Sequence, residues 1–258
     1  MLLGPIRHQY TALERNEAQG IDHLVIPRYT RVANTAANKD DINEAYALVS
    51  GSKLRNEQII EDIKECVEKG RTPVVLTKYK EHANILFEKL QGCADHIFLL
   101  QGGKSHKERD LIREQMASVG KNESIIVVAI GQYIGEGFNY PRLDTMLMAM
   151  PISFDSNVEQ YAGRLNRDYD GKKGVIIFDY IDKHIPVLER MYHKRLRTYK
   201  RIGYEICSEI KDNLNVSNSI FDRSNYHDVF EKDIACASKS IVISSPYLGG
   251  KRVHWLSD

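Results

Sequence analysis

Five short runs of apolar residues, separated by stretches of helical character, constrain the fold of this chain most. They are Pro73–Thr77 (PVVLT), His96–Leu100 (HIFLL), Ile125–Ile130 (IIVVAI), Thr145–Met150 (TMLMAM) and Gly174–Tyr180 (GVIIFDY). None alternates with polar residues, as a strand with one face in water would. Strands of this kind, separated by helices, form a parallel sheet with helices packed on both faces. We therefore predict an α/β fold in which a parallel sheet is sandwiched by helices.

The stretches between the runs have the spacing of helices that bury one face. In Asn56–Glu68, the apolar residues Ile59, Ile60, Ile63 and Val67 recur at helical intervals, and Gly70 follows as a stop signal. Further helices are predicted over His82–Leu90, Lys107–Met116, Val158–Leu165 and Pro186–Tyr199. Because ligands of such sheets bind beyond the carboxyl ends of the strands, functional residues are expected in the loops that follow them.

The two ends of the chain differ from its middle. Residues 1–40 contain two short extended pieces around a polar turn region, with too little apolar surface for a domain, and residues 41–205 contain the α/β alternation. Residues 206–258 begin with an Asn- and Ser-rich stretch and then predict a helix (Phe230–Ala237) and a strand (Ser240–Ser244). A single helix–strand pair cannot close its own core. We expect this last segment to be a linker followed by a small α/β extension.

Composition excludes several classes of protein. The chain is 42% hydrophobic and 28% charged, which is typical of a globular protein. Its net charge is +1, so any contact with nucleic acid must come from local patches. No apolar run approaches the roughly 20 residues that cross a bilayer. The four cysteines form no CxxC pair, so neither a metal site nor a disulfide framework is predicted, and a cytoplasmic location is expected.

The strongest chemical signal is Gln160–Arg167 (QYAGRLNR). On a helix it places Arg164 and Arg167 on one face near the helix end, with Gly163 allowing close packing. A guanidinium stays charged and can bind two phosphate oxygens at once. At the γ-phosphate of a nucleotide it offsets the charge that develops in phosphoryl transfer. The alternative is a basic helix end that compensates the helix dipole, and GRxxR alone does not decide between the two.

A second signal is the segment Gly135–Asp144 (GEGFNYPRLD), which follows the apolar run Ile125–Ile130. Gly135 and Gly137 permit a close approach of backbone to a ligand, and Pro141 directs the chain toward the next strand. A tight turn without a ligand is the alternative. The segment begins about 25 residues before Gln160, with one strand between them, and this spacing favours a ligand loop.

In order and spacing, these segments resemble the C-terminal RecA-like lobe of superfamily-two (DEAD/DEAH-type) helicases, and bacterial members most of all. The resemblance covers roughly residues 45–205. Ile125–Pro151 resembles motif V with its following strand, Asn157–Arg167 resembles motif VI, and Arg71–Leu90 resembles motif IV. Further matches are Leu100–Arg113, Gly171–Lys172 and Asp179–Asp182.

The resemblance implies an ATP-dependent helicase or translocase. It implies ATP with Mg²⁺ in the intact two-lobe protein and nucleic acid as a partner, with DNA favoured over RNA. Arg164 and Arg167 would be the catalytic arginines that reach the ATP phosphates. Nucleotide-binding roles are implied for Gly135, Glu136, Gly137, Asn139, Gln160 and Gly163. Nucleic-acid-binding roles are implied for Lys78, Gln101, Gly102, Gly131 and Gln132.

The chain departs from the family pattern at two positions. Ile130 stands where a threonine is common, and isoleucine has no hydroxyl group to offer a phosphate. Asn139 stands where an aspartate is common, and it keeps the acceptor oxygen without the charge. Both changes bear on motor strength and neither on the fold. They leave open a degenerate lobe that serves as an interaction module.

The sequence has no GxxxxGK[ST] phosphate-binding loop. Gly103-Lys104-Ser105 is similar to its end, but Phe98 stands where its first glycine belongs. No Asp-Glu pair follows a strand as a magnesium-binding motif would. Two arginines without a phosphate cradle and a metal ligand cannot hydrolyse ATP. We therefore expect this chain to be inactive alone and to work with an N-terminal lobe, of which residues 1–40 would be the end and the hinge.

Two further segments each leave two interpretations open. Asn225–Leu256 resembles the opening of a phospholipase-D-like domain, but His254-Trp255-Leu256 is not the HxK of that family, and an ordinary accessory unit is the alternative. With a complete domain of that kind, the lobe would be a nucleic-acid-binding platform for a nuclease. Lys183–Arg201 is a basic stretch around Tyr192 and Tyr199 that either grips a phosphate backbone or forms a solvated helix face.

Overall fold

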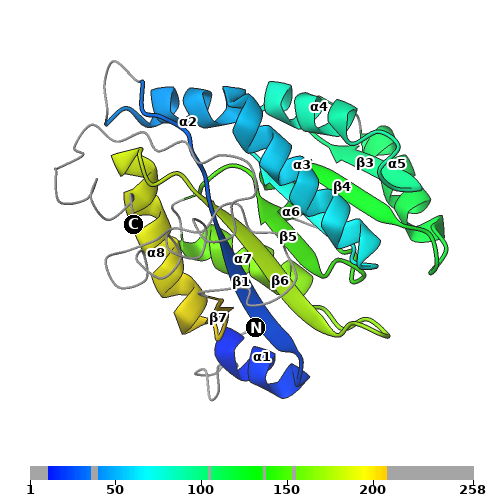
Figure 1. Cartoon of the computed structure of the whole chain (residues 1–258). Coiled ribbons are helices and arrows are strands. Elements are labelled where there is room, and N and C mark those ends of the chain that lie inside the picture. The colour runs from blue at the N-terminus through cyan, green and yellow to red at the C-terminus, as the bar shows by residue number, and fades with distance from the viewer. Residues whose placement is uncertain (1–10, 36–39, 104–105, 136–137, 153–154, 208–258) are drawn as a thin grey trace, which may run out of the picture. The chain divides into compact units, whose positions relative to one another are not determined.

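Each of the five apolar runs forms a strand, and all five lie in one sheet (Figure 1). The computed structural model describes residues 11–35, 40–103, 106–135, 138–152 and 155–207. Within these residues, seven parallel strands are ordered β3-β4-β2-β5-β6-β1-β7. They are β1 (Asp22–Tyr29), β2 (Pro73–Thr77), β3 (His96–Leu100), β4 (Ile125–Ile130), β5 (Thr145–Met148), β6 (Gly174–Ile181) and β7 (Glu205–Ile206).

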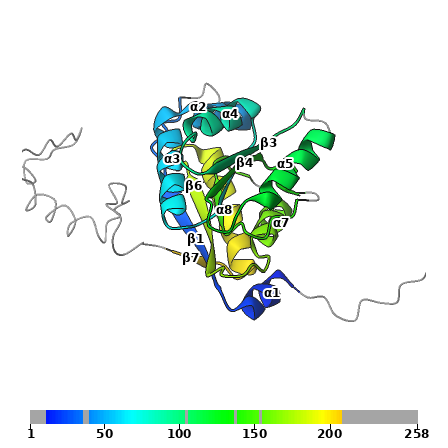
Figure 2. The ribbon, with the colours of Figure 1, turned by 90° about the vertical axis from the view of Figure 1, so that its right-hand side faces the viewer.

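Helices cover both faces of the sheet, which confirms the predicted α/β sandwich. Figure 2 shows the sheet between α3 on one side and α5 and α7 on the other. On the first face, Ile59 of α3 and Leu86 of α4 join one buried cluster, and on the second, Val158 of α7 and Tyr199 of α8 join another. The helices are α1 (Ala12–Gln19), α2 (Ile42–Gly51), α3 (Lys53–Glu68), α4 (Lys80–Lys89), α5 (His106–Ser118), α6 (Gln132–Gly135), α7 (Asp155–Leu165) and α8 (Pro186–Arg201).

The N-terminal part of the described chain belongs to this sheet. Leu24–Pro27, expected to be a piece of a preceding domain, lies in β1, which pairs with β6 along its whole length from Asp22 to Tyr29. The expected polar turn before it is the helix α1. Thr11 caps this helix, because its hydroxyl accepts from the Glu14 amide at 3.2 Å while the Glu14 carboxylate accepts from the Thr11 amide at 2.8 Å.

The strands point their carboxyl ends toward α2, and α1 lies at the opposite end of the sheet (Figure 1). We call these two ends the carboxyl edge and the amino edge. A third buried cluster closes the carboxyl edge, where Tyr46 and Val49 of α2 pack against Met150 and Leu188. The helix α2 was not predicted.

Two buried ion pairs tie the end of β6 to the helices on either side. Arg55 of α3 binds Asp182 through Nε at 2.9 Å, and Arg195 of α8 binds Asp179 through Nη2 at 2.8 Å. Each arginine also donates to a main-chain carbonyl in the segment 149–152, which leads from β5 to α7. The segment resembling the family at Asp179–Asp182 is therefore structural, because its carboxylates neutralise buried guanidinium groups.

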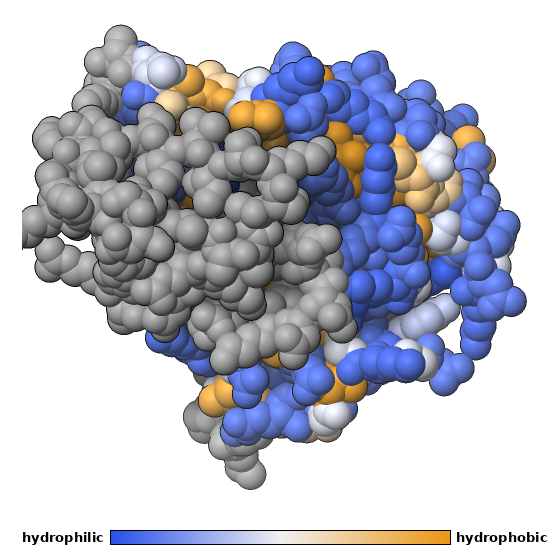
Figure 3. All heavy atoms as spheres, viewed as in Figure 1, coloured by the Kyte–Doolittle hydropathy of each residue, from blue (hydrophilic) through white to orange (hydrophobic). Residues whose placement is uncertain are grey.

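The surface gives no sign of a membrane-spanning element among the residues described. No described helix is both long and apolar enough to span a bilayer. In the view of Figure 3 the described surface is mostly hydrophilic, with small separate hydrophobic patches. The phospholipase-D-like segment and residues Glu136 and Gly137 lie outside the described residues.

Candidate nucleotide and nucleic-acid sites

The predicted site residues fall into two groups. Lys78, Gln101 and Gly131 follow β2, β3 and β4, so they lie at the carboxyl edge together with Gly102. Of the predicted nucleotide-binding residues, Gly135 ends α6, which begins at Gln132, whereas Asn139, Gln160 and Gly163 lie on segments that run back toward the amino edge. One is the segment 138–144, which leads into the start of β5, and the other is α7 with the turn after it. The two groups meet where Tyr161, next to Gln160, lies against Gly131.

Arg167 and Asn139 lie together, although 27 residues separate them in the sequence. Nη1 of Arg167 donates to Oδ1 of Asn139 at 2.5 Å. One expected detail is wrong. Helix α7 ends at Leu165, so Arg164 lies in its last turn and Arg167 lies beyond it. The two arginines therefore do not share a helical face, because the chain has already left helical geometry at Arg167.

The half-buried Lys172 links the segment 138–144 to the turn after α7. Its Nζ donates to the carbonyl of Pro141 at 2.6 Å and to the carbonyls of Leu165 and Arg167 at 2.7 Å each. Burial lowers the pKa of Lys172 to about 8, although the nearby carboxylates of Asp144 and Asp168 favour its charged form. Three carbonyl acceptors suit the three donors of an ammonium group, so Lys172 fixes the distance between the loop and the turn.

A groove of about 730 Å³ lies beside this contact. Among its lining residues are Asn139, Gly163 and Arg167, and α1 contributes Gln19. An adjoining hollow of about 440 Å³ shares Gln19 and Arg167 and is also lined by Lys172. This volume is of the size that small-molecule sites have. The groove brings together three residues with predicted nucleotide-binding or catalytic roles, Asn139, Gly163 and Arg167.

Gln19 was not identified from the sequence as a residue of the site. Its Nε2 donates to the carbonyl of Asn166 at 2.5 Å and to Oδ1 of Asp168 at 2.8 Å. One turn earlier, Asn16 accepts from Nδ2 of Asn166 at 2.6 Å and donates to the carbonyl of Ile202 at 2.6 Å. These bonds dock α1 onto the turn that carries Arg167. No local sequence pattern predicts these hydrogen bonds, because each joins residues that are well over 100 positions apart.

The close packing expected at Gly163 is not seen. A Cβ at this position would meet no atom within 4 Å, so close packing does not require the glycine. The residue instead faces the open groove. Gln160, one turn earlier on α7, is exposed, and Arg164 is half-buried.

At the carboxyl edge, two glycines are held under tyrosine side chains. A Cβ on Gly131 would lie 2.6 Å from Oη of Tyr161, and a Cβ on Gly102 would lie 3.3 Å from Cζ of Tyr133 and still closer to its hydroxyl. The amide of Gly131 also donates to the carbonyl of Thr77 at 3.1 Å, which ties the ends of β4 and β2 together. A side chain at either position would require the tyrosine above it to shift. The tyrosine partners were not identified from the sequence.

Lys78 lies exposed at the end of β2 with its charge over aromatic rings. Its Nζ is 4.4 Å from the ring centre of Tyr46 and 5.8 Å from that of Tyr79. Such cation–π contacts hold a lysine in place while leaving it charged. The side chains of Gln132 and Gly135 fall among positions whose side chains are not described, so the structure does not report their contacts.

Below Lys78, a chain of buried polar groups supports the carboxyl edge. The hydroxyl of Thr77 lies 2.7 Å from Nδ1 of His82, and Nε2 of His82 lies 2.9 Å from Oδ1 of Asn56. The amide nitrogen of Asn56 donates to the carbonyl of Ser50 at 2.9 Å. Burial, and to a lesser extent Arg55, lowers the pKa of His82 to about 4. The imidazole is therefore neutral at pH 7.

No group of three or more His, Cys, Asp or Glu residues within the described part of the chain is placed to hold a metal ion. The predicted site side chains that the structure describes include the cationic groups of Arg167 and Lys78 and the amide of Asn139. Such donors suit phosphate groups.

Comparison with known proteins finds relatives in viruses. The chain is 38% identical over 84 residues to "Uncharacterized protein 108L" of Invertebrate iridescent virus 3, covering 33% of this chain and 76% of that protein. It is 27% identical over 175 residues to "Putative helicase 161L" of Invertebrate iridescent virus 6, covering 64% of this chain and 37% of that protein. It is 29% identical over 155 residues to "Putative ATP-dependent RNA helicase QP509L" of African swine fever virus (strain Badajoz 1971 Vero-adapted), covering 59% of this chain and 28% of that protein.

The chain therefore spans about a third of the length of these two helicase relatives. Among solved structures, it superposes on T4 UvsW with a TM-score of 0.55 and 17% identity, covering 71% of this chain and 40% of UvsW. This likeness shows a shared RecA-like α/β fold. No model of a known protein family matches the chain. From its identity to protein 108L across most of that protein's length, we conclude that the chain belongs to the same family as protein 108L of Invertebrate iridescent virus 3.

Proposed function

We propose that this chain is the second motor lobe of an ATP-dependent helicase or translocase. In this proposal, Arg164 and Arg167 contact the phosphates of an ATP molecule that another lobe mainly holds. The observation that supports it is the hydrogen bond from Arg167 to Asn139 beside the groove. It joins the two segments whose sequences point to nucleotide contact. Helicase names among the relatives support the same function.

The geometry leaves Arg167 equipped to bind phosphate. A guanidinium has five N–H donors in a planar fork, and the bond to Asn139 uses one of them. Lys172 holds the main-chain carbonyl of Arg167, so the side chain starts from a fixed point. A fixed cation stabilises the charge that develops on the transferring phosphoryl group without having to reorganise first. Glu136, Gly137 and Gln160 complete the proposed nucleotide contacts.

ATP is the substrate in this proposal, and Mg²⁺ would accompany it. Bound Mg²⁺ neutralises charge on the phosphates and orients them. The described residues contain no cluster that fits this ion, so we assign no metal ligand to them.

Nucleic acid would bind at the carboxyl edge. Lys78 supplies a positive charge, and the glycines Gly102 and Gly131 let backbone amides approach phosphates closely. Gln101 and Gln132 add side-chain amides at the same edge. The resemblance to bacterial helicases favours DNA, whereas the relative from African swine fever virus carries the name of an RNA helicase. Both polymers therefore belong in the test.

The test is ATP turnover by the intact protein, with and without single-stranded DNA or RNA. Because an arginine at the transferring phosphate contributes about 10³-fold or more to such reactions, Arg167→Ala should lower turnover by roughly that factor. Arg113→Ala is the matched control, since Arg113 is an exposed arginine on α5. Lys78→Ala should reduce stimulation by nucleic acid and leave the basal rate intact.

Three outcomes would count against this assignment. Wild-type turnover in Arg167→Ala would contradict the role of the arginine. Turnover by this chain alone would contradict the shared ATP site. An intact protein that binds nucleic acid but turns over no ATP would favour the binding platform instead.

A further inference from the structure

The basic residues of helix α8 divide into a buried arginine and a set of exposed side chains. Arg195 is 1% exposed and belongs to the buried ion pair with Asp179. Tyr192 and Tyr199 are also buried, so neither ring is free to stack on a base. The other basic side chains of the helix are exposed, namely Arg190, Lys194, Arg197, Lys200 and Arg201. Within α8, the basic stretch of the sequence therefore contributes one arginine to the core and places its other basic side chains on the surface.

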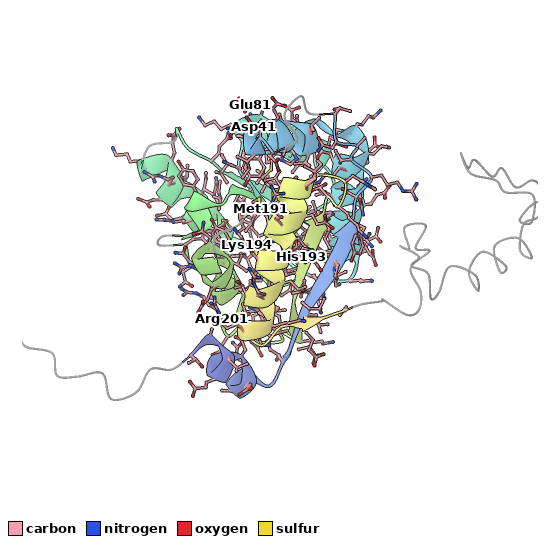
Figure 4. All side chains as sticks on the ribbon, turned by 90° about the vertical axis from the view of Figure 1, so that its left-hand side faces the viewer. Asp41, Glu81, Met191, His193, Lys194 and Arg201 are labelled. Atoms are coloured by element: carbon pink, nitrogen blue, oxygen red, sulfur yellow. The ribbon has the colours of Figure 1, made fainter. Side chains whose placement is uncertain are left out.

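Four of the exposed residues form a line, which we call the α8 stripe: Arg190, Lys194, Arg197 and Arg201. Their spacing of four, three and four residues places them on one side of the helix. At 1.5 Å per residue the stripe is about 16 Å long. In Figure 4, α8 is seen along its length, with Lys194 near its middle and Arg201 near its lower end.

The centre of the stripe has no acidic counterpart in the described part of the chain. Arg190 pairs with Asp40 at 2.8 Å at one end, and Arg201 pairs with Glu159 at 3.3 Å at the other. All four of these side chains are exposed, and such pairs contribute little to stability. No ion pair is found for Lys194 or Arg197 in between.

The charge of α8 is local, because the whole chain carries a net charge of only +1. Across the sheet, the surface of α3 carries both signs of charge, because Glu57 pairs with Lys53, and Glu65 pairs with Lys69, which directly follows the helix. The α8 stripe, by contrast, consists of cations alone. A concentrated row of cations is what a polyanion recognises.

We propose that the α8 stripe binds the phosphate backbone of a nucleic-acid strand, without reading its sequence. The inference rests on the proposed function, in which nucleic acid crosses the carboxyl edge. Helix α8 begins at that edge, directly after the loop that follows β6, so the stripe extends the path of the strand along the outside of the domain. With a length of about 16 Å, the stripe can follow several consecutive phosphates of one strand.

The experiment measures binding of a fluorescent single-stranded oligonucleotide of mixed sequence by the full chain, in a salt series. The variant is Lys194→Gln with Arg197→Gln. Its control is Lys64→Gln with Lys89→Gln, which removes two exposed lysines from α3 and α4. Since each phosphate contact on a single strand adds about 0.7 to the slope of log K against log salt, the stripe variant should lose about 1.4 from that slope. At about 50 mM salt this is a loss of affinity of roughly 60-fold.

Each result either supports or overturns the proposed binding of nucleic acid by the α8 stripe. A smaller slope and weaker binding in the stripe variant alone, with an unchanged circular dichroism spectrum, supports the inference. Equal losses in the control variant would show only a general charge effect and overturn it. Unchanged binding in the stripe variant, as expected if the stripe serves an acidic protein, overturns it, and so does a chain that binds no oligonucleotide at low salt. None of these three failures affects the proposed ATP chemistry, which the Arg167→Ala measurement tests separately.

Discussion

The buried His82 should make the stability of the domain depend steeply on pH. Its Nε2 donates to Oδ1 of Asn56, its Nδ1 accepts from the hydroxyl of Thr77, and the residue is 1% exposed. Because burial lowers its pKa from 6.5 to about 4, the unfolded chain takes up a proton on this ring before the folded chain does. Stability from this residue is therefore fully present above pH 6.5 and is lost as the pH falls toward 4.

The size of the effect follows from the two pKa values. The difference in proton binding costs about 2 kcal/mol of unfolding free energy at pH 5 and about 3 kcal/mol at pH 4, relative to pH 7. This is a large share of the 5–15 kcal/mol that typically stabilises a domain. Since His82 lies under the end of β2, the loss would also loosen the support of Lys78.

The assay is urea unfolding at pH 7, 5 and 4, comparing the unmodified chain with His82→Gln. Glutamine keeps a donor for Asn56 and does not titrate in this range, so the variant should begin less stable and lose less on acidification. His193→Gln, at an exposed position on α8, controls for the loss of an imidazole. If the unmodified chain and His82→Gln lost equal stability between pH 7 and pH 5, the assignment of a buried neutral imidazole would be refuted.

Three further substitutions test the site. Lys172→Met should lower ATP turnover of the intact protein by up to about 10²-fold through misplacement of the arginine turn, while Lys173→Met, exposed next to it, should not. Gly131→Ala should cost about 1–3 kcal/mol in urea unfolding, and Tyr161→Phe in the same chain should recover part of that loss, because it removes the atom 2.6 Å from the new Cβ. Gly163→Ala should stabilise the chain by about 0.5–1 kcal/mol in the same measurement, since its Cβ meets nothing.

The candidate site was predictable in part. Arg167 and Asn139 could be named because each lies in a motif with its own local spacing, and the structure brings them into contact. Lys172 was visible only as part of a resemblance, and its three carbonyl acceptors are main-chain atoms that no residue type encodes. Gln19 was hidden because the short polar helix that carries it lacks the apolar spacing by which helices are recognised.

What the sequence determined by itself was the sheet. The strands β2, β3 and β4 match the predicted runs residue for residue. In β2 and β4 nearly every residue is buried, and burial on both faces of a strand requires apolar side chains, which leaves a local mark in the sequence. The edge strand β3 is half-buried, and its apolar run from Ile97 to Leu100 leaves the same mark. Tertiary structure alone decided which segments meet. It placed Leu24–Pro27 beside β6, set α1 against the turn of Arg167, and divided the basic face of α8 into a buried and an exposed half. These outcomes depend on pairings between distant residues, and a pairing energy is a property of two positions that neither position shows alone.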